Sequence, residues 1–506
     1  MGIAFHFPLL IIFLPALVAI AIPVIRSIPA ARMLTLMIHL VLVGMSVWLV
    51  FTLWYSPYDY FIYLMGYFPS PYGNVIRVGM LEALLACVFS VITLLCVLGT
   101  DYDTLRDIPK SRQRLYHCMI NLLSCSLMAL VFANDIFTAY VFVEVNTLAA
   151  CSIVAIKENR ATLRATVKYL FLSVMGSGLF LLATAILFSI TGHLVMEPIH
   201  DSIVVLFANG EYQLLLTITI LFFIVSMAVK SALFPFHTWL PDAHGSATTA
   251  SSALLSGLVL KGYVVLLLKL LHRVYGIELA IELGILPILF MLGVTGMIAG
   301  SVMALLQSNI KRLIAYSSVA QIGYIFLGMG LSSIGGFTAA SFQIIAHSFT
   351  KSMLFIAAGA LINAAGSYNI ADLTGTARKN KVAGAAFTVG ALSMMGIPFF
   401  AGFVSKFYLA GAAVQSNTAL WTTLSVLAIS TFLNGLYYFP VVARIYSKQT
   451  SPAAATPQAL PAVNGSLTSA FGARATLVFM IVANISLGIF FAPLLRMLEA
   501  GFLGLG

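Results

Sequence analysis

Residues 213–244 read QLLLTITILFFIVSMAVKSALFPFHTWLPDAH, and this stretch largely determines which fold the chain can adopt. Its apolar run over 213–231 is long enough to cross a hydrocarbon core of about 30 Å. The run contains Lys230, and Pro235 and Pro241 then interrupt the helix because proline has no N–H to donate. Broken backbone at membrane depth is tolerated only inside protein or beside water. The stretch therefore predicts a membrane helix with a break that lines a polar cavity.

Similar apolar runs recur along all 506 residues, of which 61% are hydrophobic and only 8% charged. The mean hydropathy is +1.04, and a soluble protein of this size needs far more charged surface. The chain therefore reads as an all-α membrane protein, a single polytopic domain over 1–506 with about fourteen transmembrane helices. We expect spans near 5–25, 33–54, 79–100, 115–134, 136–156, 166–191, 213–231, 247–271, 284–308, 313–333, 338–363, 383–412, 418–443 and 475–497.

The net charge of +10 reflects membrane topology and not a nucleic-acid partner. Of the 26 lysines and arginines, 17 fall in loops after odd-numbered spans, 3 fall on the other side and 6 lie within or at the ends of spans. The positive-inside rule then places the loops after odd-numbered spans in the cytoplasm. Both termini are therefore expected on the outer side of the cell's inner (plasma) membrane. No basic residue precedes the first apolar run, so we expect that span to be kept and not cleaved as a signal peptide.

A second break, at Gly396-Ile-Pro398 and Gly402, lies five spans after the first. Pro235 frees the carbonyl of Ser231, and Pro398 frees that of Met394. Breaks in spans 7 and 12 fit two inverted five-helix repeats, formed by spans 4–8 and 9–13, with the ion path near the breaks. We therefore expect helices 1–3 in 1–114, repeats in 115–271 and 284–443, a flexible loop over 449–472, and a last helix in 475–497.

Four ionisable residues lie deep inside spans: Glu144, Lys230, Lys261 and Lys406. Each costs at least ~2.5–3.5 kcal/mol at mid-membrane unless it is paired or reached by water. We prefer a functional interpretation to structural pairing. Burial shifts the pKa values of lysine and glutamate toward neutral pH, where both side chains can exchange protons. A Glu144–Lys230 pair that opens and closes would switch the proton affinity of Lys230.

Histidines supply candidate relays. His347 and Lys351 are four residues apart on one helix face, and imidazole titrates near neutrality. His347 is interpreted as a relay, the alternative being a satisfied core histidine. His237 and His244 flank the first break, where capping of the loop and proton access are equally good interpretations. Glu82, near the outer end of its helix, is more plausibly structural.

Metal and cofactor motifs are missing from the sequence. The five cysteines lie in apolar segments without a Cys-x-x-Cys pair, and no glycine-rich dinucleotide loop or haem-like histidine pair occurs. We expect packing cysteines, no metal, no cofactor and no catalytic redox residue. Electron transfer would have to reside in partner subunits, so whether the chain serves an oxidoreductase stays open.

Four motifs resemble those of the antiporter-like subunits of respiratory complex I and of Mrp-type multisubunit antiporters. The resemblance covers helices four to thirteen, and its ordered motifs are Lys230-Ser-Ala-Leu-Phe-Pro-Phe-His-Thr-Trp-Leu-Pro-Asp-Ala-His244, Arg312-Leu-Ile-Ala-Tyr-Ser-Ser-Val-Ala-Gln-Ile-Gly323, His347-Ser-Phe-Thr-Lys-Ser-Met-Leu-Phe355 and Gly396-Ile-Pro-Phe-Phe-Ala-Gly-Phe-Val-Ser-Lys406.

The resemblance implies a fourteen-helix fold with paired inverted repeats and a central polar axis. In that axis Glu144 governs Lys230, and protons pass through Lys261 and His347 to an exit at Lys406. Asp242 and Ser256, within and after the first motif, join His237 and His244 as candidate access residues, and Lys351 accompanies His347.

The subtype of antiporter-like subunit that the chain resembles follows by elimination. Lys406 argues against the complex I subunit with glutamate there, and the chain stops at Gly506 without the lateral helix of the largest subunits. The third complex I homologue typically lacks the Trp239-Leu-Pro-Asp-Ala-His244 form. The D-type Mrp subunit, or its relatives in membrane-bound hydrogenase complexes, remains.

The chain departs from the family pattern at both breaks. Ala247-Thr-Thr-Ala-Ser-Ser252 replaces a proline-containing segment, and Ser256 replaces a common histidine, which puts access near Lys261 in doubt. Phe399 replaces a second proline and should weaken the second break.

Three functions follow. The first is a proton-translocating subunit of a Mrp-type antiporter exchanging H⁺ for Na⁺ or K⁺, with other membrane subunits and lipid as partners. The alternative is a proton- or sodium-pumping subunit of a redox-driven complex, of the hydrogenase or NADH dehydrogenase type. A non-conducting scaffold is the second alternative.

Overall fold

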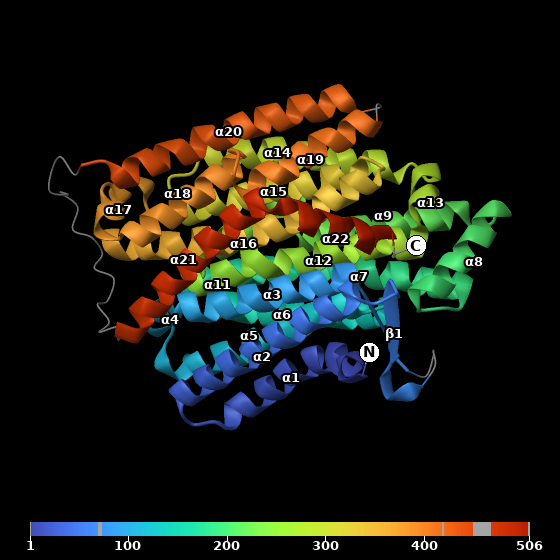
Figure 1. Cartoon of the computed structure of the whole chain (residues 1–506), viewed down its shortest axis with the longest axis horizontal. Helices are drawn as coiled ribbons and strands as arrows, with labels where there is room; N and C mark the ends of the chain where they lie inside the picture. The colour runs from blue at the N-terminus through green and yellow to red at the C-terminus, as the bar shows by residue number, and fades with distance from the viewer. Residues whose placement is uncertain (1, 69–72, 417–418, 449–466, 504–506) are drawn as a thin grey trace.

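The computed structural model describes residues 2–68, 73–416, 419–448 and 467–503. The chain forms an elongated bundle in which most helices run roughly parallel to the long axis (Figure 1). Thirteen helices of the described chain are long and apolar enough to span a membrane. The twelfth expected span is divided into two shorter helices, so each of the fourteen expected spans has a helical counterpart.

The first three spans are α1, α2 and α3, and a β-hairpin connects the second of them to the third. Its two strands pair antiparallel from Tyr60 opposite Gly79 to Leu64 opposite Val75. The hairpin lies at one end of the bundle, here called the hairpin end, and a short helix after the third span lies at the other, the α4 end (Figure 1). The elements are η1 (Gly2–His6), α1 (Phe7–Ala21), η2 (Ile22–Val24), α2 (Ile28–Trp54), β1 (Tyr60–Leu64), η3 (Met65–Tyr67), β2 (Val75–Gly79), α3 (Met80–Gly99) and α4 (Asp101–Asp107).

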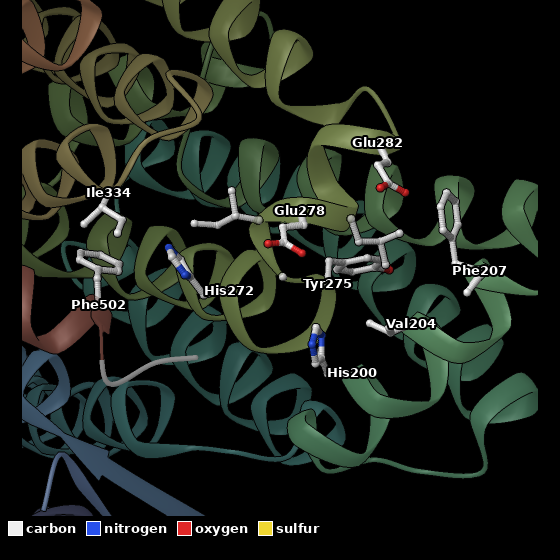
Figure 2. Close-up of a pocket in the computed structure, with 13 residues that line it drawn as sticks. His200, Val204, Phe207, His272, Tyr275, Glu278, Glu282, Ile334 and Phe502 are labelled. Atoms are coloured by element: carbon white, nitrogen blue, oxygen red, sulfur yellow. The ribbon is translucent and has the colours of Figure 1, made fainter. Parts of the chain in front are cut away.

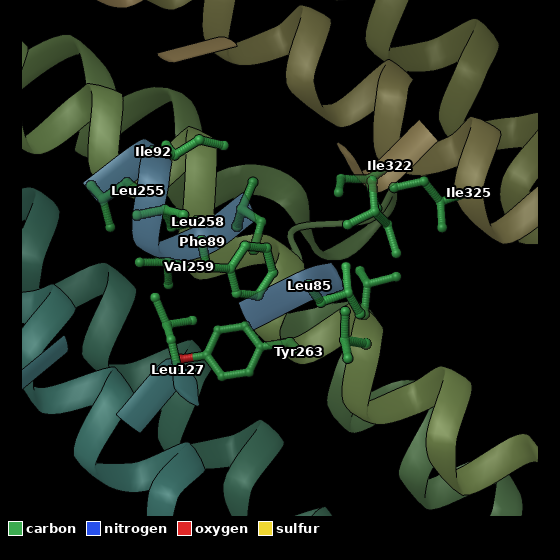
Figure 3. Packing of buried hydrophobic residues seen from close by; sticks show 14 of the residues in the cluster. Leu85, Phe89, Ile92, Leu127, Leu255, Leu258, Val259, Tyr263, Ile322 and Ile325 are labelled. Carbon is green, nitrogen blue, oxygen red and sulfur yellow. The ribbon is translucent and has the colours of Figure 1, made fainter. Parts of the chain in front are cut away.

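Spans four to eight follow, with α8 an extra helix at the hairpin end. In the most apolar 18 residues of the eighth span, Thr249–Tyr275, every residue is buried, whereas in those of α2 only 28% are, and α2 shows a broad apolar face outward. Figure 3 shows Leu255, Leu258 and Val259 of this span packed near Phe89 and Leu127. The elements are α5 (Lys110–Phe132), α6 (Ile136–Ala155), α7 (Arg160–Thr191), α8 (Met196–Ala208), α9 (Gln213–Lys230), η4 (Phe236–Thr238), α10 (Trp239–Ser246), α11 (Thr249–Leu254), η5 (Leu255–Val259), α12 (Leu260–Lys269), η6 (Leu270–Tyr275) and α13 (Ile277–Glu282).

Spans nine to fourteen complete the bundle. In α14 and α15 the backbones touch, since a Cβ on Gly293 would lie 2.3 Å from the Leu327 nitrogen. Small residues permit such close helix approach in membranes. The elements are α14 (Ile285–Leu305), α15 (Ile310–Gly330), α16 (Ile334–Ala365), η7 (Ile370–Leu373), α17 (Thr376–Lys379), α18 (Lys381–Met395), α19 (Ala401–Ser416), α20 (Leu420–Tyr446), α21 (Leu467–Ile489) and α22 (Phe491–Leu503).

Both expected breaks are present. Span seven stops at Lys230 and resumes at Phe236, and span twelve stops at Met395 and resumes at Ala401. Each break holds a non-glycine residue in the left-handed region, Ala232 at φ 57° and Phe399 at φ 75°. Such residues are sparse and persist where the surroundings fix them. The expectation that Phe399 weakens the second break stays a prediction, and the turn there is made by Gly396 and Phe399 together.

Two expectations near the C-terminus need correction. The expected single helix over 475–497 is divided at Phe490 into α21 and α22, because Pro493 cannot donate a hydrogen bond back to the carbonyl of Ile489. The expected loop over 449–472 is shorter, since α21 begins at Leu467, and its 449–466 part lies outside the described residues.

Candidate functional site

Lys230, the last residue of α9, lies at the break in span seven and is fully buried. Its Nζ is 3.9 Å from Oε1 of Glu144 on α6 and donates a hydrogen bond of 2.7 Å to Oγ1 of Thr147. The expected pair therefore forms, but loosely. The Glu144 side chain was expected inside the helix bundle, yet it is 28% exposed on the flank of the chain. Only one of the two partners is fully desolvated.

Polar residues that the sequence analysis missed surround this pair. Thr147 Oγ1 lies 3.2 Å from the hydroxyl of Tyr263 on the eighth span. The buried amide of Asn146 has no hydrogen-bond partner among the described residues, and it borders Gly262, where a Cβ would lie 3.6 Å from its Nδ2. Asn146 thus faces the neighbour of Lys261. Asn146 and Thr147 follow Glu144 within one helical turn, which was the available signal.

A central cluster is formed by Lys261, His347, Lys351 and His244, all fully buried. His347 is close enough to interact electrostatically with both Lys261 and Lys351, and His244 with the same two lysines. Lys261 Nζ donates to the carbonyl of Ser256, a carbonyl in the π-helical turn η5. Both imidazoles lack hydrogen-bond partners among the described residues. Unpaired buried imidazoles beside two amines favour a relay over a satisfied core histidine.

Lys351 connects the cluster to the second half of the chain. Its Nζ donates to the Ile314 carbonyl at 3.0 Å and to Oγ of Ser317, and it lies 3.4 Å from the hydroxyl of Tyr438. The Tyr438 ring lies 4.8 Å from that of Tyr437, whose hydroxyl donates to the Asn434 side chain. None of these α15 and α20 residues was singled out from the sequence.

Lys406 ends this path at the second break. Its Nζ donates to the carbonyls of Met394 at 2.9 Å and Met395 at 3.0 Å. The Met394 carbonyl, which Pro398 frees, also accepts from Asn434 Nδ2 at 3.1 Å. The proline-containing break therefore supplies the acceptors that hold the buried ammonium.

A second polar connection runs beside the first. Gln343 lies one turn before His347 on α16, and its Oε1 accepts a hydrogen bond of 2.5 Å from Ser405, the neighbour of Lys406. Its Nε2 donates to Gln321 at 2.6 Å. Residues 343, 347 and 351 are spaced by four, so one face of α16 carries amide, imidazole and ammonium in sequence.

The access candidates separate in space. Asp242 is paired with Lys168 at 2.7 Å and with Arg312 at 3.0 Å, beside a cavity of about 690 Å³ at the α4 end. His237 Nε2 lies 3.2 Å from the sulfur of Met303. Ser256 Oγ bonds Ser318 at 2.9 Å, next to Lys261. Only His244 and Ser256 of the four are placed at the central cluster.

A separate charged network closes the hairpin end. Arg273 donates to Glu82 at 2.6 Å, and Arg77 donates to Glu197 at 2.6 Å. Lys269 donates to the carbonyls that end α5, including that of Val131 at 2.8 Å. This arrangement agrees with a structural role for Glu82, since each carboxylate there is paired.

A cavity of about 790 Å³ lies near that end of the eighth span. Figure 2 shows His200, His272 and Glu278 around it, with Phe502 at one side. In the described part of the chain, no group of three or more histidine, cysteine, aspartate or glutamate side chains could hold a metal ion.

One hydroxyl of the axis can be tested directly. Tyr438→Phe removes the hydroxyl 3.4 Å from Lys351 Nζ, and hydrogen bonds to charged groups contribute ~1.5–3 kcal/mol. If the axis carries protons, as the sequence predicts, transport should fall at least about 10-fold. Tyr275→Phe is the matched control, because it removes an equally buried hydroxyl, bonded to Thr219 at 2.7 Å. Transport by the reconstituted complex measures both, and equal losses in both variants would contradict the assignment.

Comparison with known proteins agrees with this fold. A family model described as NADH:quinone oxidoreductase/Mrp antiporter, TM matches residues 133–433, more than half of the chain. NADH-quinone oxidoreductase subunit N of Desulforudis audaxviator is 29% identical over 454 residues, covering 88% of this chain and 87% of that protein. The subunit N of Moorella thermoacetica is 29% identical over 441 residues, covering 86% and 85%.

Two solved structures share the fold at lower identity. A chain of the membrane-bound sulfane sulfur reductase, an archaeal respiratory membrane complex, superposes with a TM-score of 0.85 at 23% identity, covering 98% of this chain and 97% of that one. A chain of the Mrp complex from Dietzia sp. DQ12-45-1b gives 0.85 at 21% identity, covering 100% and 98%.

Fold and matches together define a multi-pass, antiporter-like membrane protein. The chain belongs to the NADH:quinone oxidoreductase/Mrp antiporter family. The motifs were interpreted as excluding the complex I subunits. This exclusion is not supported, because relatives named as NADH-quinone oxidoreductase subunits match over most of their length.

Proposed function

We propose that the chain is a proton-translocating subunit of a redox-driven, multisubunit membrane complex. The observation that carries this proposal is the buried series that begins at the Glu144–Lys230 pair, 3.9 Å apart, and continues through Lys261, His347 and Lys351 to Lys406. Each group can hold or release a proton, and burial makes an unneeded charge costly. The names of the sequence relatives, which are respiratory subunits, favour a redox-driven complex over the Mrp type.

The Glu144–Lys230 pair acts as the switch. A carboxylate at 3.9 Å stabilises the ammonium, and when the pair opens the ammonium loses that stabilisation in a buried site and releases its proton toward the central cluster. Thr147 keeps Lys230 in place during the change, because its hydroxyl accepts at 2.7 Å. This proton release depends only on the charge of Glu144 and on the distance between the two side chains.

Partner subunits complete the device. Glu144 is 28% exposed on the flank of α6, and α2 shows large apolar side chains outward, among them Trp48 and Phe51. Other membrane subunits cover part of these faces, so that the redox reaction in a partner can act on Glu144. By the distribution of basic loops, the α4 end faces the cytoplasm and both termini lie outside.

Glu144→Gln tests the switch because it removes the charge with little change in volume. We expect proton transport by the assembled complex to fall about 10-fold, since ~1–2 kcal/mol is a reasonable coupling for one partly exposed carboxylate. Glu158→Gln is the control, because Glu158 forms a half-exposed pair with Arg112 at 2.7 Å. Unchanged transport in Glu144→Gln would contradict the proposed switch.

An Mrp-type cation/proton antiporter is the second candidate, because the description of the matching family model names both NADH:quinone oxidoreductases and Mrp antiporters. The two candidates differ in what drives transport. Proton movement that depends on an electron donor supports the redox-driven complex. Movement driven by a Na⁺ or K⁺ gradient alone supports the antiporter.

A further inference from the structure

α4 carries three aspartates at the end of the bundle opposite the hairpin, and their environments differ. Asp103 and Asp101 are both buried, but Asp101 pairs outward with Arg32 at 2.9 Å. Asp103 instead points inward, where Asn363 on α16 donates to its Oδ1 at 2.9 Å, and the same oxygen lies 3.6 Å from Nη2 of Arg106. Asp107 is held by Arg106 at 2.7 Å and lies 3.5 Å from Lys157.

A cavity of about 340 Å³ reaches Asp103 from the surface. Its wall includes Asp103 and Asn363, and the exposed Lys379 and Arg474 lie at its edge. The other oxygen of Asp103 borders Gly359 and Thr249, because a Cβ on Gly359 would lie 3.0 Å from Oδ2 and 3.0 Å from the Thr249 hydroxyl. The carboxyl therefore stands between the cavity and the start of the eighth span.

Lys311 lies behind this carboxyl. It is 1% exposed at the start of α15, and its Nζ donates to the carbonyl of Ala247 at 2.6 Å. It is near enough to interact electrostatically with Asp103, Asp107, Lys157 and Arg106. Ala247 belongs to the turn just after α10, which places the ammonium next to the segment that carries His244.

His244 joins Lys311 to the central cluster. It interacts electrostatically with Lys311, Lys351 and Lys261, and neither ring nitrogen has a hydrogen-bond partner among the described residues. Its ring stacks on Phe355, one turn beyond Lys351, at 4.6 Å. An unpaired, fully buried imidazole among three amines is a group that can accept a proton from one and pass it to another.

We propose that protons reach the central cluster through the Asp103 cavity, by way of Lys311 and His244, and not through the Asp242 cavity. The Asp103 carboxylate takes a proton from the cavity and gives it to the neutral amine of Lys311, which passes it to His244 and so to Lys261 or Lys351. Each donor returns to its deprotonated form, so the series is ready for the next proton. This route rests on the proposed function and names its uptake site.

Electrostatics distinguishes the two cavities. Asp242 is paired with Lys168 and Arg312, and Arg164 also lines its cavity, so a single carboxylate faces three cations. Asp103, by contrast, is buried and has one ion pair among the described residues, with Arg106 at 3.6 Å, whereas Asp242 is 34% exposed between two paired cations. Burial raises the pKa of Asp103 above its ordinary value, although the hydrogen bond from Asn363 and the charges of Arg106 and Lys311 act to lower it. A raised pKa brings that carboxyl closer to the pH at which it can exchange protons.

Asp103→Asn in the intact complex, reconstituted in liposomes, tests the route. We expect proton transport to fall on the order of 10-fold, as for loss of one proton-transfer group. The loss should deepen as the pH at the α4 end is raised, because uptake then depends on the bulk proton concentration. Small weak acids such as formate should restore part of the rate by carrying protons into the cavity, which a structural defect would not allow.

Asp101→Asn is the matched control, since it removes the same charge from the same helix two residues away, and it should transport at the wild-type rate. Wild-type transport in Asp103→Asn, or a loss in Asp101→Asn as large as that in Asp103→Asn, would overturn the route. So would a loss confined to Asp242→Asn. If Lys230→Ala is inactive while Asp103→Asn is not, only the uptake route fails; if both are active, the proposed function fails as well.

Discussion

Lys230→Ala is expected to reduce proton transport by about 100-fold while leaving the complex assembled. Without the amine, a proton that crosses the first half of the chain has no group to occupy between Glu144 and the eighth span. An unsolvated charge at mid-membrane costs ~2.5–3.5 kcal/mol, and 1.36 kcal/mol is tenfold in rate, which gives the factor of about 100. Electron-donor-driven acidification in liposomes is the measurement, with subunit content checked on the same preparation.

The complex should still assemble in Lys230→Ala, because Glu144, which loses its partner, is not fully buried. Glu144 is 28% exposed and can be neutralised or meet water, and Thr147 retains its helical bond to the carbonyl of Val143 at 2.8 Å. A complex that assembles normally and transports at the wild-type rate without Lys230 would establish the scaffold alternative. The loss of transport must also exceed that of Glu144→Gln, because the glutamate only modulates the amine.

Lys406 should show a comparably large effect of a different kind. Lys406→Met removes the proton-exchanging group at the second break and leaves the Met395 carbonyl without its donor, while Met394 keeps Asn434. We expect transport to fall about 100-fold for the reason given for Lys230, and stability to fall by ~1–3 kcal/mol for the unpaired carbonyl. Transport assays and thermal unfolding of the purified complex measure the two effects.

Lys406→Arg separates the two effects. A guanidinium still donates to the carbonyls of the break but cannot release its proton in a protein. This variant should unfold like the wild type and yet transport as poorly as Lys406→Met. Normal transport with arginine at 406 would show that Lys406 is a structural cation and that the exit lies elsewhere.

Particular residues show how far the sequence could lead. Lys230, Lys261, His347, Lys351 and Lys406 were identifiable because each is a polar residue inside an apolar run. Thr147, Ser317, Gln343 and Tyr438 were not, because small polar residues and tyrosines are ordinary in membrane helices. What distinguishes these four is a hydrogen bond to a charged residue, or to the neighbour of one, on another helix.

The sequence by itself determined the membrane class, the spans, the two breaks and the charged residues of the axis. These follow from local rules, since apolar length, proline and the cost of a buried charge act within one segment. Only the tertiary structure decided that Glu144 is 28% exposed, that Asp242 is paired with two cations, and that Asp103 lies within electrostatic range of Lys311. Which charges meet depends on how helices distant in sequence pack, and no local pattern encodes that choice.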